Sequence, residues 1–162
     1  SGTLGDSALA LQLLQAGKTP PPPLTKRFVT PSARIELGCF LSEKGLATAM
    51  LDVSDGLLAD LNHLLVASGV GAELVLSALP LSGAFRSALE QDTSLIDLAL
   101  AGGEDYELLF SSQRHDLEGM DLPAPGVVKI GHIRAETGMI IRQDNGDSYQ
   151  CRRRGFDHFA AS

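Results

Sequence analysis

The sequence has few cysteines, no long apolar stretch and no excess of basic residues, and each absence narrows the class of protein. Its two cysteines, Cys39 and Cys151, show none of the CxxC or Cys/His spacings of a metal site. A chain of 162 residues, 44% of them hydrophobic, can bury one compact core without a disulfide. We therefore expect a single domain in a reducing, cytoplasmic setting.

Segments that would target the chain to a membrane are also missing. No apolar stretch reaches the ~20 residues that a membrane-spanning helix needs. The first residues, SGTLGD, lack the basic and apolar regions of a secretory signal. They also lack an initiator methionine and begin in a glycine-rich turn, so we expect a piece of a longer protein with no membrane partner.

Positive charge is scarce. Thirteen Lys and Arg stand against 20 Asp and Glu, which gives a formal net charge of -7. A surface that tracks a phosphate backbone would have to act against this field, so we expect no nucleic-acid partner. A nucleotide is still compatible with the charge, because an acidic site holds phosphates through a bridging divalent metal.

Several familiar catalytic patterns are absent. The four histidines form no HxxxH or HxH pair, which argues against a histidine metal site. The sequence also contains no GxSxG, Walker A or GxGxxG motif. These absences remove support for a nucleophile elbow, a P-loop and a Rossmann dinucleotide site.

The hydrophobic patterning predicts alternating helices and strands within one domain. Four prolines, at 20–23, predict a rigid extended spacer after the first helix. The strand, helix and strand between 47 and 76 are typical of a parallel pair with a crossover, and 127–142 predicts a hairpin turning at Thr137-Gly138. The predicted helices are 6–16, 33–44, 55–68, 81–91 and 94–101, and the predicted strands are 47–53, 72–76, 106–111, 127–133 and 139–142.

The most informative motif is DVSDG at 52–56, which puts polar side chains where a strand ends and a helix begins. Asp52 and Asp55 are suited to Mg²⁺, which accepts a few carboxylates and bridges to phosphates. Ser54 can donate to a phosphate oxygen, and the N–H groups of the new helix favour an anion there. The alternative is that Asp55 or Ser54 only caps the helix.

A second motif, GGEDYE at 102–107, places a glycine pair before three acids and an aromatic residue. Paired glycines permit close approach of the backbone to a ligand. The alternative is a helix end followed by solvated acids. Neither motif decides between these interpretations by itself.

Taken in order, GTLGDSA, AMLDVSDGL, SGVGAEL, ALAGGEDYELLF and GFDHF resemble the C-terminal half of the thiamine-monophosphate kinase family. That family belongs to a superfamily with aminoimidazole ribonucleotide synthetase, selenophosphate synthetase and a hydrogenase maturation protein. The similarity extends from Gly2 to Phe159. It implies an α/β fold of the α+β kind, a layered α/β/α sandwich with a mixed sheet.

The resemblance implies Mg²⁺-dependent transfer of the ATP γ-phosphoryl group to thiamine phosphate, without a covalent catalytic residue. Asp52 and Asp55 would then bind Mg²⁺, Ser54 would contact ATP, and Glu104 would contact the thiamine substrate. Phe156, in GFDHF, would stack on that substrate. The family usually has Trp there, and this chain has no Trp. Phe keeps a π face, but its attraction for a cation is weaker.

The resemblance also implies that residues 1–162 are a single C-terminal domain of a two-domain kinase. The N-terminal domain, which binds ATP and forms a homodimer, would be absent, so the isolated chain would be inactive. Two alternatives stay open. One is another ATP-dependent synthetase of the same superfamily, and the other is a non-catalytic binding domain.

Overall fold

A computed structural model describes residues 1–123 and 126–153 of the chain. Phe156, which the sequence predicts to stack on the substrate, lies outside the described residues. The α-helices are α1 (Asp6–Gln15), α2 (Pro22–Val29), α3 (Ile35–Glu43), α4 (Leu57–Ser68), α5 (Gly83–Leu89) and α6 (Ile96–Ala101). The 3₁₀ turns are η1 (Leu76–Ala78), η2 (Thr93–Leu95) and η3 (Leu117–Gly119). The strands are β1 (Ala49–Val53), β2 (Gly71–Val75), β3 (Glu107–Ser111), β4 (Gly131–Arg134) and β5 (Gly138–Arg142).

The strands form two small sheets. Strand β1 pairs only with β3, in antiparallel fashion, while β2 lies between an antiparallel β4 and a parallel β5. The predicted parallel pairing of 47–53 with 72–76 is therefore wrong, and so is the hairpin predicted over 127–142. Strand β2 takes the central position because it carries the core residues Ala72 and Leu74 and bonds along both edges.

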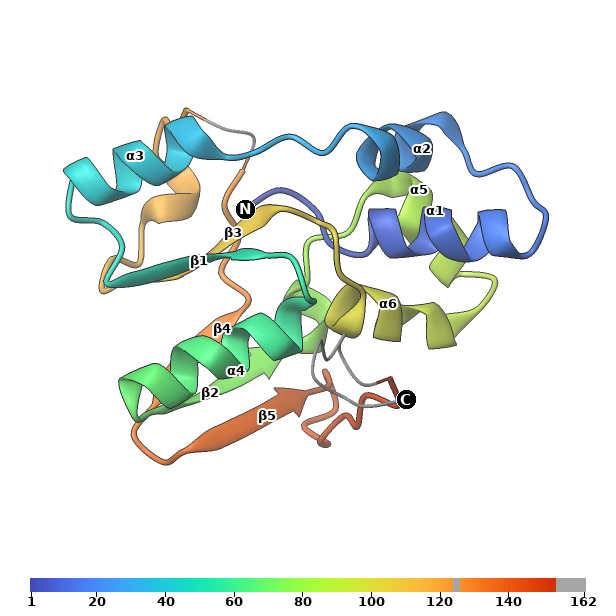
Figure 1. The fold of residues 1–162 in the computed structure, drawn as a ribbon. Coiled ribbons are helices and arrows are strands. Elements are labelled where there is room, and N and C mark those ends of the chain that lie inside the picture. Colours follow the sequence, from blue (N-terminus) through green and yellow to red (C-terminus); the bar gives the residue numbers. More distant parts are fainter. Residues whose placement is uncertain (124–125, 154–162) are drawn as a thin grey trace.

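The β1–β3 pair is the middle of three layers and lies between α3 on one side and α4 on the other (Figure 1). Alternate side chains of a strand face opposite sides of a sheet. On one face Val53 and Leu109 join the main core beneath α4, and on the other Phe110 joins the smaller core around Leu37 and Leu41 of α3. The mixed fold with a layered arrangement is confirmed, with its mixed sheet divided into two parts.

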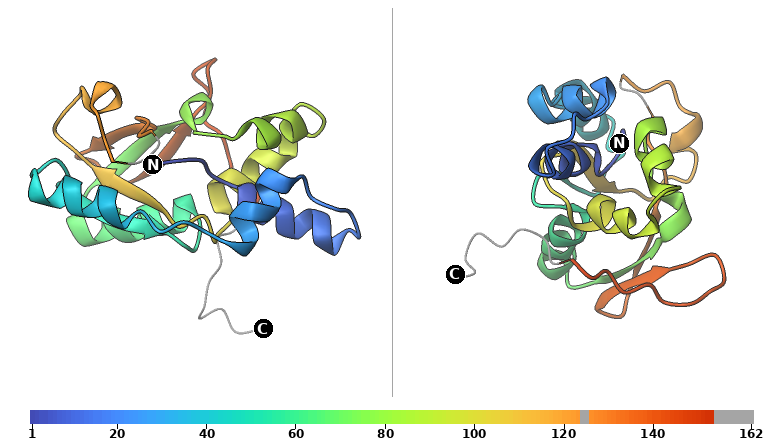
Figure 2. Two further views of the ribbon diagram at one scale, coloured as in Figure 1. Left: turned by 90° about the horizontal axis from the view of Figure 1, so that it is seen from above. Right: turned by 90° about the vertical axis from the view of Figure 1, so that its right-hand side faces the viewer.

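Helices α1, α2, α5 and α6 pack together at the end of the molecule where β1 ends (Figures 1 and 2). The prediction of an extended spacer at 20–23 is wrong from Pro22 onward. Pro21 is extended, but Pro22 and Pro23 occupy the first positions of α2. Proline is accepted there because its missing N–H would have no partner in the helix, and its fixed φ suits the first turn.

The predicted helices at 33–44, 55–68, 81–91 and 94–101 are confirmed in type, with shorter bounds. Helix α1 begins at Asp6, and Gly5 is its N-cap without any side-chain cap. Within the described residues, no helix is both long and apolar enough to cross a bilayer.

Candidate functional site

The two motifs singled out in the sequence lie side by side. Because β1 and β3 are antiparallel, the end of β1 meets the start of β3, with Val53 opposite Glu107. The N–H of Tyr106 donates to the Val53 carbonyl at 2.8 Å, and the N–H of Glu104 donates to the Ser54 carbonyl at 2.8 Å. The 54–56 loop and the 102–106 loop therefore form one unit at this end of the sheet.

Glycines let the two loops approach this closely. A Cβ on Gly103 would collide with the carbonyl oxygen of Ser54, and one on Gly102 would collide with the Leu98 carbonyl and the Ala8 side chain. Gly56 has φ 113°, which other residues rarely adopt, and a Cβ there would lie 2.9 Å from the Ala101 carbonyl oxygen. The glycine pair thus serves packing between the loops and also ends α6.

Asp60, in the first turns of α4, holds the 54–56 loop. Its buried Oδ2 accepts the backbone N–H groups of Ser54, Asp55 and Gly56 at 3.0, 3.0 and 3.2 Å. Burial raises the pKa of Asp60, and these hydrogen bonds partly oppose that shift. Asp60 therefore binds the N–H groups of Ser54, Asp55 and Gly56, and these three are not available to a phosphate.

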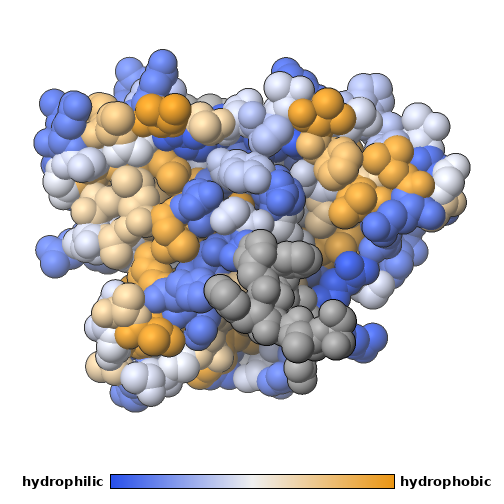
Figure 3. All heavy atoms as spheres, in the orientation of Figure 1, coloured by the Kyte–Doolittle hydropathy of each residue, from blue (hydrophilic) through white to orange (hydrophobic). Residues whose placement is uncertain are grey.

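The alternative that the side chain of Asp55 or Ser54 only caps α4 is wrong. The N-cap of α4 is Gly56, and no side chain caps it. Asp52 is exposed and Ser54 and Asp55 are half-buried, so all three side chains lie at or near the surface. Figure 3 shows hydrophilic residues gathered near the middle of this face, between apolar patches on either side.

Glu104 and Tyr106 project from the 102–106 loop toward the same surface. The Tyr106 hydroxyl donates to Glu104 Oε2 at 2.7 Å. That hydrogen bond and the Glu104 charge raise the pKa of Tyr106, with smaller contributions from Asp52 and Asp55. The structure therefore brings Glu104, Asp52 and Asp55 around one tyrosine, although they lie far apart in the sequence.

The donor set available to a metal ion is small. Residues 1–123 and 126–153 contain no group of three or more His, Cys, Asp or Glu side chains that could hold an ion. Mg²⁺ nevertheless binds proteins through one or two carboxylates plus waters and substrate phosphates. Asp52 and Asp55 fit that pattern. Two carboxylates are too few ligands for a metal ion that this chain would hold alone.

Behind the loops, the charge of the buried Glu107 is balanced by two arginines. Its side chain is 1% exposed and forms ion pairs at 2.6 Å with Arg27 of α2 and with Arg34, the residue before α3. Burial would raise the pKa of Glu107, but hydrogen bonds from Arg34 and Ser1 and the charge of Arg27 outweigh it, so the pKa is lowered. This cluster fixes β3 against both helices.

The segment before the GFDHF motif is fastened to α6. Asp97 accepts from the Tyr149 hydroxyl at 2.8 Å and from the Arg152 N–H at 3.1 Å. Helix α6 leads directly into the 102–106 loop, so the last described residues lie at the same end of the molecule as the two motifs. The role predicted for Phe156 stays a prediction, since it lies outside the described residues.

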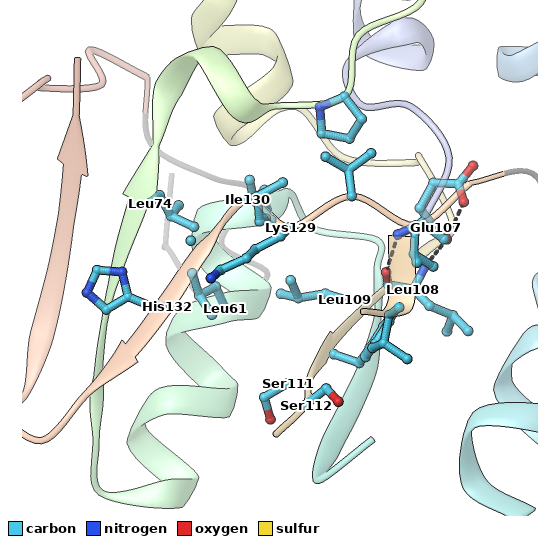
Figure 4. Close-up of a pocket in the computed structure, with 18 of the residues that line it drawn as sticks. Leu61, Leu74, Glu107, Leu108, Leu109, Ser111, Ser112, Lys129, Ile130 and His132 are labelled. Atoms are coloured by element: carbon cyan, nitrogen blue, oxygen red, sulfur yellow. Dashed lines mark hydrogen bonds between the residues drawn. The ribbon is translucent and has the colours of Figure 1, made fainter. Parts of the chain in front are cut away.

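A cavity lies elsewhere, between the two sheets. It has a volume of about 390 Å³, and Leu61, Leu74, Leu109 and Ile130 surround it, from α4, β2, β3 and the segment before β4 (Figure 4). Glu107, the last residue of the GGEDYE motif, lines this cavity, whereas Asp52, Ser54, Asp55 and Glu104 do not. The cavity therefore reaches the motif only at its buried acid.

Comparison with known proteins finds relatives that match nearly the whole of this chain. The curated thiamine-monophosphate kinase of Aquifex aeolicus (strain VF5) is 37% identical over 164 residues, which cover 98% of this chain and 50% of that protein. The crystal structure of thiamine-monophosphate kinase from Stenotrophomonas maltophilia K279a is 38% identical, with a TM-score of 0.75, over 92% of this chain and 49% of that one. AaThiL complexed with AMPPCP and TMP is 35% identical, with a TM-score of 0.80, over 98% of this chain and 50% of that one.

The chain thus spans about half the length of the relatives it matches, and the resemblance inferred from the motifs is confirmed. The sequence model for "AIR synthase related protein, C-terminal domain" matches residues 2–141, which include both motif loops. This match covers most of the chain, and the layered fold agrees with it. The chain therefore belongs to the family of AIR synthase related proteins, as their C-terminal domain.

Proposed function

We propose that this chain is the C-terminal domain of a two-domain thiamine-monophosphate kinase. The enzyme transfers the γ-phosphoryl group of ATP to thiamine phosphate, giving thiamine diphosphate and ADP. The observation that carries the proposal is the meeting of DVSDG and GGEDYE in one polar surface, in a chain similar to AaThiL complexed with AMPPCP and TMP. AMPPCP is an analogue of ATP, so the ligands of that relative correspond to the two substrates proposed here.

Phosphoryl transfer requires little covalent chemistry from the protein. The donor and acceptor must be held in line, and the charge on the transferring group must be neutralised. The charged groups that surround Tyr106 at the loops are acids, so neutralisation would fall to Mg²⁺, which Asp52 and Asp55 would hold. Substrate phosphates and waters would supply further ligands, together with acids from the N-terminal domain that the family resemblance implies.

The remaining residues orient the substrates. The Ser54 hydroxyl would donate to a phosphate oxygen of ATP. The Glu104 carboxylate complements the cationic thiazolium and the amino group of thiamine, and the Tyr106 hydroxyl holds it in one orientation. Phe156 supplies an aromatic face to the same substrate. No residue of this domain is required to form a bond to the phosphoryl group.

A second domain of the kinase would supply further functions. An N-terminal domain would bind ATP and form the homodimer, so residues 1–162 alone would have little or no activity. We place the reaction in the cytoplasm, with no nucleic-acid or membrane partner, in keeping with the net charge of -7.

The test is release of ADP by the full-length protein with Mg²⁺-ATP. Thiamine phosphate, thiamine, formylglycinamidine ribonucleotide and selenide are offered in parallel as acceptors. We expect ADP release with thiamine phosphate alone and its loss in Asp55→Asn. Turnover with another acceptor and none with thiamine phosphate would transfer the function to a sister synthetase, and Mg²⁺-ATP binding without any turnover would indicate a binding domain.

A further inference from the structure

The loop that carries Glu104 is held in a strained conformation. Glu104 has φ 67° and Tyr106 has φ 51°, and they are the only described residues other than glycine with positive φ. Such a conformation is unfavourable for a residue other than glycine and persists only where surrounding contacts enforce it. The contacts that enforce it therefore determine where the Glu104 carboxylate lies.

Two backbone hydrogen bonds hold the loop from the side of β1. They join the N–H of Glu104 to Ser54 and the N–H of Tyr106 to Val53. These bonds fix the loop at one edge only. They would not by themselves keep the Asp105 side chain turned inward. It is this inward turn of Asp105 that directs the side chains of Glu104 and Tyr106 outward.

Asp105 supplies the second fastening, from the inside. Its side chain is 1% exposed, and both carboxyl oxygens lie within hydrogen-bond distance of the Gly5 backbone nitrogen, at 3.1 and 2.9 Å. Gly5 is the N-cap of α1, and a Cβ there would lie 2.6 Å from the Phe85 ring. The Asp105 carbonyl also accepts from Arg27 Nη2 at 2.9 Å.

Charged groups from three elements face Asp105. Arg27 comes from α2, Asp6 from α1 and Glu107 from β3. Burial raises the pKa of Asp105 to about 8, opposed by the Gly5 N–H and Arg27 and reinforced by the two acids. Burial therefore favours the protonated carboxyl, which keeps an oxygen that accepts from Gly5.

We propose that Asp105 is the positioning residue for Glu104. Its buried hydrogen bond to Gly5 ties the 102–106 loop to the start of α1 and so turns Glu104 and Tyr106 outward, toward Asp52 and Asp55. This inference rests on the proposed function, because Glu104 is there the contact to thiamine phosphate. Asp105 itself touches no substrate.

The first arm of the test measures structure and needs no activity. Amide hydrogen exchange of Glu104 and Tyr106 is followed by NMR in the full-length protein and in Asp105→Asn and Asp105→Ala. Asn retains an oxygen that accepts from Gly5, while Ala retains none. We expect exchange at both amides to quicken at least about tenfold in Asp105→Ala, with the β1–β3 amides still protected and near-normal protection in Asp105→Asn.

The second arm measures the two KM values. Asp105→Ala is expected to raise KM for thiamine phosphate at least about tenfold and to leave KM for ATP unchanged, while Asp105→Asn stays near the parent. Leu41→Ala, in the other core, is the matched control, because it destabilises the fold away from the loop. It should change neither KM nor the two amides selectively.

The outcomes separate the two proposals. Unchanged exchange at Glu104 and Tyr106 in Asp105→Ala, or an equal rise of both KM values, would overturn the positioning role. Equal damage from Asn and Ala would also overturn it, because the hydrogen bond to Gly5 would then not be the cause. If the full-length protein does not use thiamine phosphate, the proposed function fails while the exchange measurement still decides the role of Asp105.

Discussion

Acidic side chains lie in opposite environments on the two sides of residues 102–107, which comprise the 102–106 loop and the first residue of β3. Glu104 is on the outer side and exposed, and its carboxylate accepts a hydrogen bond from the neighbouring Tyr106 hydroxyl. Asp105 and Glu107 are on the inner side, each 1% exposed, with their oxygens bonded to the protein. A buried acid without such partners would be very unfavourable, so the inner acids serve structure, and we propose that the outer acids serve the ligand.

The inner acids also differ from each other. Glu107 has two arginine partners, which lower its pKa, whereas Asp105 has an amide partner and two acidic neighbours, and its pKa is raised. Burial alone therefore does not decide the charge of a carboxyl group. The groups that face it decide, and here they give one charged and one mostly neutral acid two residues apart.

The largest effect on stability is expected from Glu107→Ala. Removing this carboxylate leaves Arg27 and Arg34 partly buried without their partner, and breaking a buried ion pair typically costs about 3–5 kcal/mol. Urea unfolding of the full-length protein would measure the loss. Glu90→Ala is the control, since Glu90 is exposed, and it should change the free energy of unfolding by less than about 0.5 kcal/mol.

Gly103→Ala tests the contact between the two motif loops, because it should push them apart. The new methyl group would collide with the Ser54 carbonyl, and overpacking of this kind costs about 1–3 kcal/mol. Turnover should fall along with stability, because Ser54 and Glu104 lose their common frame. Gly83→Ala meets no atom within 4 Å at the start of α5 and should be tolerated. Equal tolerance of both variants, judged by thermal melting and turnover, would contradict the loop contact.

The pH dependence of stability separates the inner acids. The folded pKa of Asp105, about 8, is above its ordinary value of 3.8, so the unfolded chain loses this proton first as pH rises. Stability from Asp105 is complete below pH 4 and is lost as the pH rises toward 8. Glu107 works in the opposite direction, because its pKa is lowered, and its contribution is lost in acid.

Asp105→Asn isolates that effect. The variant cannot ionise, so its free energy of unfolding relative to the parent should increase steadily between pH 5 and pH 8. Urea unfolding at several pH values gives this difference directly. A difference that stays constant with pH would show that Asp105 is already ionised at neutral pH.

Much of the local structure was predictable from the sequence, and most of the pairing was not. The helices at α3 and α4 follow from periodic leucines such as Leu37 and Leu61 and from glycines that end them. The pairing of β1 with β3 joins strands more than 50 residues apart, and no local pattern specifies it. Helix α2 was missed because prolines that begin a helix and prolines that prevent one look alike in sequence.

The candidate site shows the same division. Asp52, Ser54, Asp55 and Glu104 could be selected from their motifs, but their meeting depends on the β1–β3 pairing. Asp60 was missed, although an acid in the first turns of a helix after a glycine is a signal for it. No sequence signal distinguishes Asp105 from Glu104, because only the strained loop turns one inward and the other outward.

The most direct test of this division uses Asp52, which lies on the outer side and is exposed. In full-length protein, turnover of Mg²⁺-ATP with thiamine phosphate and the free energy of unfolding are measured together for Asp52→Asn. The account predicts a loss of turnover of at least about 100-fold, partly restored by more Mg²⁺, with stability unchanged within about 0.5 kcal/mol. Full turnover per folded molecule, with or without a loss of stability, would contradict it.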